Sequence, residues 1–217
     1  MCGKFTQMMS WGELVTLADL VGAPAGLTET VTPMRFATVI RLDAQGQREA
    51  ARMRWGFVPA GARDPSEGTR FIHARAETIE QRPTFREAFF RRRGIVVVNT
   101  FNEGKEITPR KTEQYVVTLK ERPATAIAVI WERWTDKSSV LESFAMVTVP
   151  PNQLIATITD RMPALIADDD WSKWLGEEPA SVDELKALLQ PSGLAMDMAR
   201  ATKPAPPPKP KAQPDLF

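Results

Sequence analysis

The chain begins with Met1 and Cys2, and Cys2 is its only cysteine. The small side chain of Cys2 permits removal of Met1, which would leave a free α-amine and a thiol on adjacent carbons. Such a 1,2-aminothiol condenses with an aldehyde to an imine, and the thiol then closes on the imine carbon to form a thiazolidine ring. The amine titrates near pH ~7.7 and the thiol near ~8.5, so both reactive forms are accessible at neutral pH. Position alone favours an incidental cysteine, so the reactive interpretation depends on the residues that accompany it.

Composition describes a globular protein without bulk basicity. Of the 217 residues, 43% are apolar and 25% are charged, and the net charge is +1, so any nucleic-acid partner needs a local basic patch. One cysteine excludes an internal disulfide and favours a reducing cytoplasm. With His73 as the only histidine, we expect no metal site and no cofactor. We also expect no signal peptide and no membrane span, because the first ten residues lack an apolar core and no apolar run approaches ~20 residues.

The residue patterns predict an α+β fold. A helix is expected over 11–21, a hairpin over 35–57 with its turn at 43–47, and a short strand over 71–78 that leads into a helix near 85–92. Strand-like runs follow at 95–98, 115–119, 126–130 and 144–149, and then two short helices, one carrying Trp171 and Trp174 and one starting at Ser181. Because strands outnumber helices, we expect a mixed, largely antiparallel sheet with a barrel-like core and flanking helices.

The composition changes near the carboxyl end. We expect residues 1–200 to form one domain and residues 201–217, which are rich in Pro and Lys, to form a disordered tail. The tail ends in Gln213, Pro214, Asp215, Leu216 and Phe217, which resembles the bacterial sliding-clamp-binding pentapeptide Gln-x-(Ser/Asp)-Leu-Phe. A flexible tether would deliver Leu216 and Phe217 to an apolar pocket. Pro214 departs from the usual Leu, and a random tail ending is the alternative.

Five short segments stand out in the sequence: Met1–Phe5, Arg54–Pro59, Ala74–Thr78, Ile130–Trp134 and Asp160–Pro163. In their order and spacing, these segments resemble the SRAP family (SOS response-associated peptidases, also described as abasic-site processing proteins). The resemblance implies an α/β domain with a positively charged groove for single-stranded DNA. It also implies that Cys2, once free of Met1, forms a thiazolidine with the ring-opened aldehyde of an abasic site, and that the protein removes its own Met1.

The resemblance also implies catalytic residues. Glu103 lies in the segment that matches the family's Gly-aromatic-aromatic-Glu and is the candidate acid/base; a solvated glutamate at a strand end is the alternative. His73 stands where the family usually has Asn, and Thr159 stands where it usually has His. Thr159 cannot act as a base near pH 7. Either His73 supplies the missing imidazole or part of the catalysis is lost, and the sequence leaves both open.

The implied DNA surface is altered too. Lys4 stands where Arg is usual, and Gly61 stands where a Trp is usual. Arg75 and Arg161 are retained as phosphate contacts, with Pro33 and Met162 as apolar neighbours of the groove. For two other groups we favour structural roles. We expect Arg91, Arg92 and Arg93 to form a solvated helix end, with a further basic patch as the alternative. We expect Trp131, Trp134, Trp171 and Trp174 to pack in the core, with base stacking as the alternative.

Three functional hypotheses result. The first is a cytoplasmic, nucleoid-associated, monomeric enzyme that captures abasic sites in single-stranded DNA in the DNA-damage or SOS response, with autopeptidase and crosslinking or lyase activity. The second is a degenerate paralogue that binds DNA or the sliding clamp without efficient crosslinking, motivated by the residues at His73, Gly61, Thr159 and Gly104. The third is a thiol autopeptidase whose only task is the release of Met1.

Overall fold

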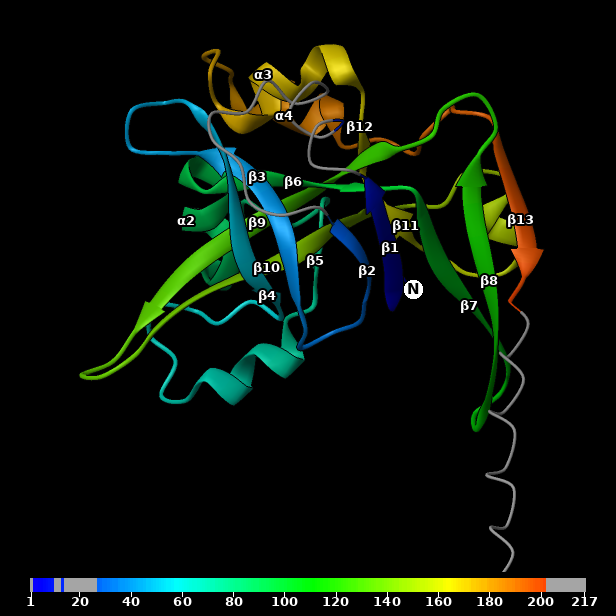
Figure 1. Ribbon diagram of the computed structural model, residues 1–217, viewed down its shortest axis with the longest axis horizontal. Helices are drawn as coiled ribbons and strands as arrows, with labels where there is room; N and C mark the ends of the chain where they lie inside the picture. The colour runs from blue at the N-terminus through cyan, green and yellow to red at the C-terminus, as the bar shows by residue number, and fades with distance from the viewer. Residues whose placement is uncertain (1, 10–12, 14–26, 202–217) are drawn as a thin grey trace, which may run out of the picture.

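The computed structural model describes residues 2–9, 13 and 27–201, and it shows two β-sheets flanked by short helices (Figure 1). The smaller sheet has five strands in the order β13-β8-β7-β1-β2, and every pairing in it is antiparallel. Its strands are β1 (Lys4–Met9), β2 (Leu27–Val31), β7 (Thr100–Thr108), β8 (Lys111–Leu119) and β13 (Met196–Arg200). Strand β1 is internal, with β2 on one side and β7 on the other.

The larger sheet closes on itself. Neighbouring strands run in the order β10-β4-β3-β6-β9, and β9 pairs again with β10, so five strands form a closed ring. These strands are β3 (Phe36–Leu42), β4 (Arg48–Trp55), β6 (Arg93–Val98), β9 (Thr125–Thr135) and β10 (Val140–Val149). Three short strands extend the sheet: β5 (His73–Arg75), β11 (Met162–Pro163) and β12 (Leu165–Ile166). Among the strands that the structure describes, only β10 makes parallel pairs, with β4 and with β5, so the predicted mixed, largely antiparallel, barrel-like core is confirmed.

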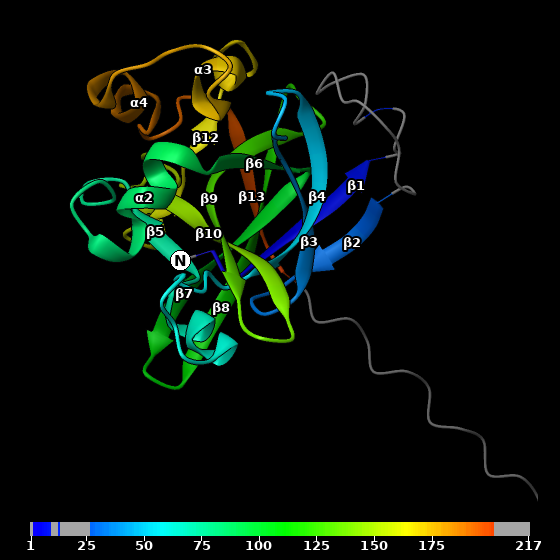
Figure 2. The same cartoon turned by 90° about the vertical axis from the view of Figure 1, so that its left-hand side faces the viewer.

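The hydrophobic core includes residues of the barrel strands and of the flanking helices. Figure 2 shows α2, α3 and α4 beside the barrel. Residues 125–130 of β9 do not alternate between buried and exposed: all six are buried. Both faces of this part of the strand are therefore covered by other parts of the protein. Helix α2 (Pro83–Arg91) packs on the barrel through Phe85, Ala88 and Phe89. Helices α3 (Trp171–Leu175) and α4 (Val182–Leu188) are short, and three 3₁₀ turns complete the elements: η1 (Pro65–Arg70), η2 (Ile155–Thr157) and η3 (Asp168–Asp170). In the described part of the chain, no helix has the length and apolarity to cross a bilayer.

Several local predictions are confirmed. The 35–57 hairpin is β3 and β4, and its turn is fixed by Asp43, whose Oδ1 accepts hydrogen bonds from the N–H groups of Gln45 and Gln47. Helix α4 begins with the predicted capping box, in which Ser181 and Glu184 satisfy each other's backbone N–H groups. The predicted tryptophan packing holds: Trp134, Trp171 and Trp174 are at most 4% exposed. Trp131 is half-buried, packs against the core and lies beneath the Arg41 guanidinium.

The arginine triplet 91–93 spans the end of α2 and the start of β6, and Arg91 forms an exposed pair with Glu87 on the helix. Arg92 pairs with Glu132 at 2.8 Å, and Arg93 donates to backbone carbonyl oxygens of Phe89, Phe90 and Trp174. The helix expected over 11–21 and the tail over 201–217 fall almost wholly outside the described residues, so these two predictions and the domain boundary at residue 200 remain predictions.

Candidate active site at the amino terminus

Cys2 lies two residues before β1 and is only 1% exposed. Its thiol points to the carbonyl oxygen of Lys4, at a Sγ–O distance of 3.5 Å. Burial raises the pKa of the Cys2 thiol well above its usual range, and the nearby Glu103 carboxylate raises it further. The thiol is therefore protonated at neutral pH, and its reaction requires a group that accepts the proton.

Glu103 is the candidate for the group that accepts the proton of the Cys2 thiol. It lies on β7 next to Asn102, which pairs with Lys4 of β1, so the ladder brings Glu103 to the start of the chain. Its side chain is 0% exposed, which excludes the alternative of a solvated glutamate. Burial raises the pKa of Glu103 to about 7, although the nearby backbone N–H of Cys2 lowers it. A carboxyl group with a pKa near 7 can both accept and donate a proton at physiological pH.

His73 holds the other side of residue 2. It lies on β5, and its Nε2 is 2.7 Å from the carbonyl oxygen of Cys2. Because a carbonyl oxygen only accepts, Nε2 carries the hydrogen, and in the neutral ring Nδ1 carries the lone pair. Burial lowers the pKa of His73 to about 4, so the ring is neutral at pH 7. The edge of the ring faces Trp55, with 6.1 Å between centroids.

A basic pocket adjoins this site. It has a volume of about 410 Å³, and His73 forms part of its wall together with Arg70, Ile72, Arg75, Arg82, Phe85 and Thr148. The three arginines are exposed, and none of the lining residues is acidic. Figure 2 shows β5 and α2, which supply His73, Arg75 and Phe85, on the same side of the barrel. Three guanidinium groups without a carboxylate among them favour an anionic ligand such as a phosphate.

Arg161 has a different environment from the pocket arginines. It is 8% exposed and makes a bidentate contact with Glu77, at 2.5 and 2.9 Å, while Nη2 also donates to the carbonyl oxygen of Thr148 at 2.6 Å. This contact joins two segments that are far apart in sequence and fixes the loop that carries Thr159. A phosphate would have to compete with Glu77 and Thr148 for Arg161, and the DNA contact of Arg161 remains a prediction.

The remaining predicted residues are spread around the site. Thr159 is half-buried just after η2, and its backbone N–H donates to the carbonyl oxygen of Ile155. Lys4 is exposed on β1, Pro33 is half-buried between β2 and β3, and Met162 is fully buried. Gln213, Leu216 and Phe217 lie outside the described residues. The structure thus brings Cys2, Glu103 and His73 into contact, whereas the DNA and clamp roles of the other residues remain predictions.

The sequence matches the family described as SOS response associated peptidase (SRAP) over residues 1–203. The chain belongs to the SRAP family. It is 31% identical over 196 residues to the abasic site processing protein YoqW of Bacillus subtilis, which covers 88% of this chain and 87% of YoqW. It is 25% identical over 167 residues to the abasic site processing protein HMCES of Xenopus tropicalis, covering 65% of this chain and 50% of HMCES.

Solved structures share the fold of this SRAP chain. A crystal structure of a Bacteroides thetaiotaomicron protein superposes with a TM-score of 0.80 at 23% identity, covering 93% of this chain and 92% of that protein. A Bordetella bronchiseptica protein superposes with a TM-score of 0.77 at 21% identity, covering 93% and 100%. At these identities the likeness shows the fold alone.

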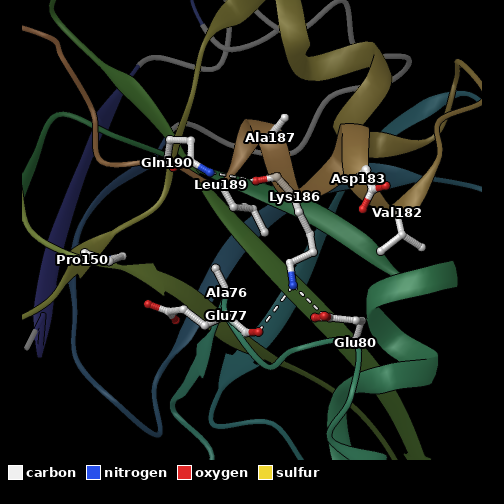
Figure 3. Close-up of a pocket in the computed structure, with 10 residues that line it drawn as sticks. All are labelled: Ala76, Glu77, Glu80, Pro150, Val182, Asp183, Lys186, Ala187, Leu189 and Gln190. Carbon is white, nitrogen blue, oxygen red and sulfur yellow. Dashed lines mark hydrogen bonds and ion pairs between the residues drawn. The ribbon is translucent and has the colours of Figure 1, made fainter.

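A larger pocket of the SRAP domain lies beyond Glu77, between the loop after β5 and helix α4 (Figure 3). It has a volume of about 640 Å³, and Lys186 reaches across it to Glu80 at 2.5 Å and to the carbonyl oxygen of Glu77 at 3.4 Å. The pocket contains neither Cys2 nor Glu103 nor His73. Lys186 is the only cation among its lining residues and is already paired with Glu80, so we place the chemistry at the smaller basic pocket. Among the described residues, no group of three His, Cys, Asp or Glu side chains could hold a metal ion.

Arg70 and Arg82 are site residues that the sequence patterns did not identify. A signal for Arg82 was present: it is the N-cap of α2, it precedes Pro83, and the first turn contains no acidic residue. A cation at a helix amino terminus is unfavourable because it opposes the helix dipole. Its presence there suggests a role other than stabilising the helix. Arg70 is the last residue of η1 and carried no comparable signal.

Proposed function

We propose that this SRAP protein captures abasic sites in single-stranded DNA through Cys2 after Met1 has been removed. The observation that supports this most directly is the position of the buried Glu103 carboxyl group beside the Cys2 nitrogen, whose N–H lowers the pKa of that carboxyl group. This nitrogen is the atom that becomes the α-amine when the Met1–Cys2 peptide bond is hydrolysed. It would then lie against a buried carboxyl group with a pKa of about 7, which is suited to proton transfer at that atom.

The first step releases Met1. One water molecule is consumed, the Met1–Cys2 bond breaks, methionine leaves with the new carboxyl group, and Cys2 keeps the nitrogen as an amine. The Cys2 thiol belongs to the residue whose nitrogen forms this bond and is the candidate nucleophile, with the nearby Glu103 accepting the thiol proton. His73 donates to the Cys2 carbonyl oxygen and so fixes the orientation of residue 2.

The second step captures the aldehyde. The amine of Cys2 attacks the C1′ carbon of the ring-opened sugar, and Glu103 in its protonated form donates to the departing oxygen, so water leaves and an imine forms. The thiol then adds to the imine carbon, and its proton passes through Glu103 to the nitrogen. The product is a thiazolidine, and the two condensation stages together release one water molecule. Glu103 ends in the protonation state in which it began, as a catalyst must.

The basic pocket supports the choice of a nucleic-acid substrate. Arg70, Arg75 and Arg82 line a pocket that shares His73 with the Cys2 site, so phosphates flanking an abasic nucleotide could bind there. A net charge of +1 for the whole chain would not retain DNA without such a patch.

A crosslinking assay tests the proposal. The protein is incubated with single-stranded oligonucleotides that contain either a natural abasic site or its tetrahydrofuran analogue, which has no aldehyde, and adducts are resolved on a denaturing gel. We expect an adduct with the natural site only, and none with Cys2→Ala. Mass spectrometry of the amino terminus shows whether Met1 is absent. If wild-type protein lacking Met1 forms no adduct, the capture mechanism is wrong.

A second candidate is a DNA-binding module that no longer crosslinks. Thr159 favours it because this side chain cannot serve as a base at neutral pH, and Gly104 favours it because it leaves no side chain beside Glu103. This candidate predicts binding to both oligonucleotides in fluorescence anisotropy and an adduct with neither. An adduct that forms within minutes would exclude it.

A further inference from the structure

A row of side chains extends from Glu103 across the smaller sheet. Glu103 of β7 pairs directly with Tyr115 of β8, and Tyr115 pairs directly with Arg200 of β13. The three strands lie side by side in Figure 1. Residues directly opposite one another in a sheet share a face, with Cβ atoms about 5 Å apart. Tyr115 therefore lies on the same face as the acid/base and next to it.

Tyr115 occupies the edge of the buried region. One row towards the core, Phe101 and Val117 are at most 1% exposed, and Glu103 itself is 0% exposed. Tyr115, in contrast, is half-buried, so part of its side chain reaches solvent. Aromatic rings deeper in the site, those of Phe5 and Trp55, are fully buried and cannot stack on a ligand. Tyr115 is the only tyrosine of the chain.

Cations surround this ring on the solvent side. Arg200 has a side chain that is 64% exposed and lies 2.5 Å from Glu113, and Lys105 pairs directly with Glu113 in the next row. Lys105 and Arg200 therefore flank Tyr115 on two strands, and Glu113 offsets one of these two charges. An aromatic ring with cations on either side is the arrangement that binds a nucleobase and its phosphates in single-stranded nucleic acids.

We propose that Tyr115 stacks on the nucleobase adjacent to the abasic nucleotide and thereby sets the position of the strand over Cys2. This inference rests on the proposed function, since it assumes that an abasic nucleotide occupies the Cys2 site. An abasic nucleotide has no base of its own to bind, so the neighbouring base is the nearest group that can hold the sugar in register.

A cycle of variants and oligonucleotides tests the stacking. Tyr115→Leu removes the aromatic face and keeps an apolar side chain on the strand, whereas Tyr115→Phe keeps the ring. Affinity is measured by fluorescence anisotropy with tetrahydrofuran oligonucleotides, which cannot crosslink, and melting temperatures confirm that each variant is folded. Phe90→Leu, which alters an exposed ring on α2, serves as the matched control.

We expect Tyr115→Leu to weaken binding on the order of tenfold and Tyr115→Phe and Phe90→Leu to have little effect. When the nucleotide on the stacked side is also replaced by tetrahydrofuran, the effect of Tyr115→Leu should vanish; placing it on the 5′ or the 3′ side identifies the base. An equal effect on all oligonucleotides, or none, would overturn the inference. Failure of the proposed function looks different, because wild-type protein would then form no adduct with a natural abasic site.

Discussion

His73 and Glu103 lie at the two ends of one residue: Nε2 of His73 lies 2.7 Å from the Cys2 carbonyl oxygen, and the Cys2 N–H lowers the pKa of the nearby Glu103 carboxyl group. Two side chains from two different sheets thus face the two backbone groups of Cys2. The Cys2 carbonyl oxygen can only accept a hydrogen bond, so Nε2 of His73 must carry a hydrogen. The neutral ring therefore cannot accept a proton at Nε2. His73 is a positioning residue in this arrangement, and Glu103 is left as the group that moves protons.

The low pKa of His73 gives a pH dependence with a defined sign. The folded-state pKa is about 4 and the ordinary value is 6.5, so between these values the unfolded chain binds more protons than the folded one. The contribution of His73 to stability therefore rises with pH from about 4 to 6.5, by up to about 3 kcal/mol, and is fully present above 6.5, whereas the raised pKa of Glu103 contributes with the opposite sign. The difference in melting temperature between wild type and His73→Gln should therefore shift in favour of wild type as the pH rises over this range. Because His73 is the only histidine, NMR titration of its ring protons needs no assignment, and an apparent pKa near 6.5 would contradict the prediction.

Glu103→Gln should slow both release of Met1 and aldehyde capture by roughly 10²–10⁴-fold, because glutamine keeps the size of the side chain and cannot carry a proton. Intact-protein mass spectrometry measures the first reaction, and the rate of adduct formation on the gel measures the second. Glu106→Gln is the matched control, since Glu106 is exposed on the same strand. Equal rates for the two variants would remove Glu103 from the mechanism.

The pocket arginines should control affinity through phosphates. Arg70→Gln and Arg82→Gln are each expected to weaken binding to the tetrahydrofuran oligonucleotide and to lower the slope of log K against log salt by about 0.7 per lost contact. Arg63→Gln, an exposed arginine that does not line the pocket, should leave the slope unchanged. A salt series in fluorescence anisotropy decides between these results. Unchanged slopes for both pocket variants would mean that the strand passes elsewhere.

The contact between Arg161 and Glu77 should stabilise the fold. Glu77→Gln leaves the buried guanidinium without its opposite charge and should lower the free energy of unfolding by about 1–3 kcal/mol in urea titrations. Glu87→Gln breaks an exposed pair with Arg91 on α2 and should cost less than about 0.5 kcal/mol. If the two variants were equally stable, Arg161 would be available for a role other than structural support.

The carboxyl-terminal peptide makes a separate prediction. If Gln213–Phe217 binds a bacterial sliding clamp, Phe217→Ala should weaken clamp binding by at least about tenfold in surface plasmon resonance, since large apolar anchors dominate small interfaces. Lys211→Ala lies in the same tail and should have little effect. Crosslinking by the Phe217→Ala variant should match wild type, because the active site is unchanged. Clamp binding that survives deletion of residues 213–217 would exclude the tail.

Local patterns predicted much of the fold. The turn at Asp43 and the capping box at Ser181 depend on residues within four positions of each other, and both are as expected. Strand β7 was not predicted, because its sequence Thr100–Thr108 has a glycine at position 104 and charged residues on both faces. Its position beside β1 comes from pairing across almost a hundred residues.

Long-range relationships set the limits of prediction for the site. Cys2 and Glu103 followed from the family motifs, but burial of Glu103, which gives it a useful pKa, depends on the closed barrel and the second sheet. The bidentate contact of Arg161 with Glu77 spans 84 residues. The family motifs identified Arg161, but they could not show that the Glu77 carboxylate is already bound to its guanidinium group.

Strand β1 has a mechanical consequence for any DNA attached at residue 2. The strand starts two residues after Cys2 and is bonded along both edges, to β2 and to β7. A motor enzyme that pulled on the attached strand along the β1 axis would load these hydrogen bonds in shear, so many bonds would share the force. The attachment point would resist being dragged out of the domain, and an advancing replication or unwinding machine would meet an anchored obstacle.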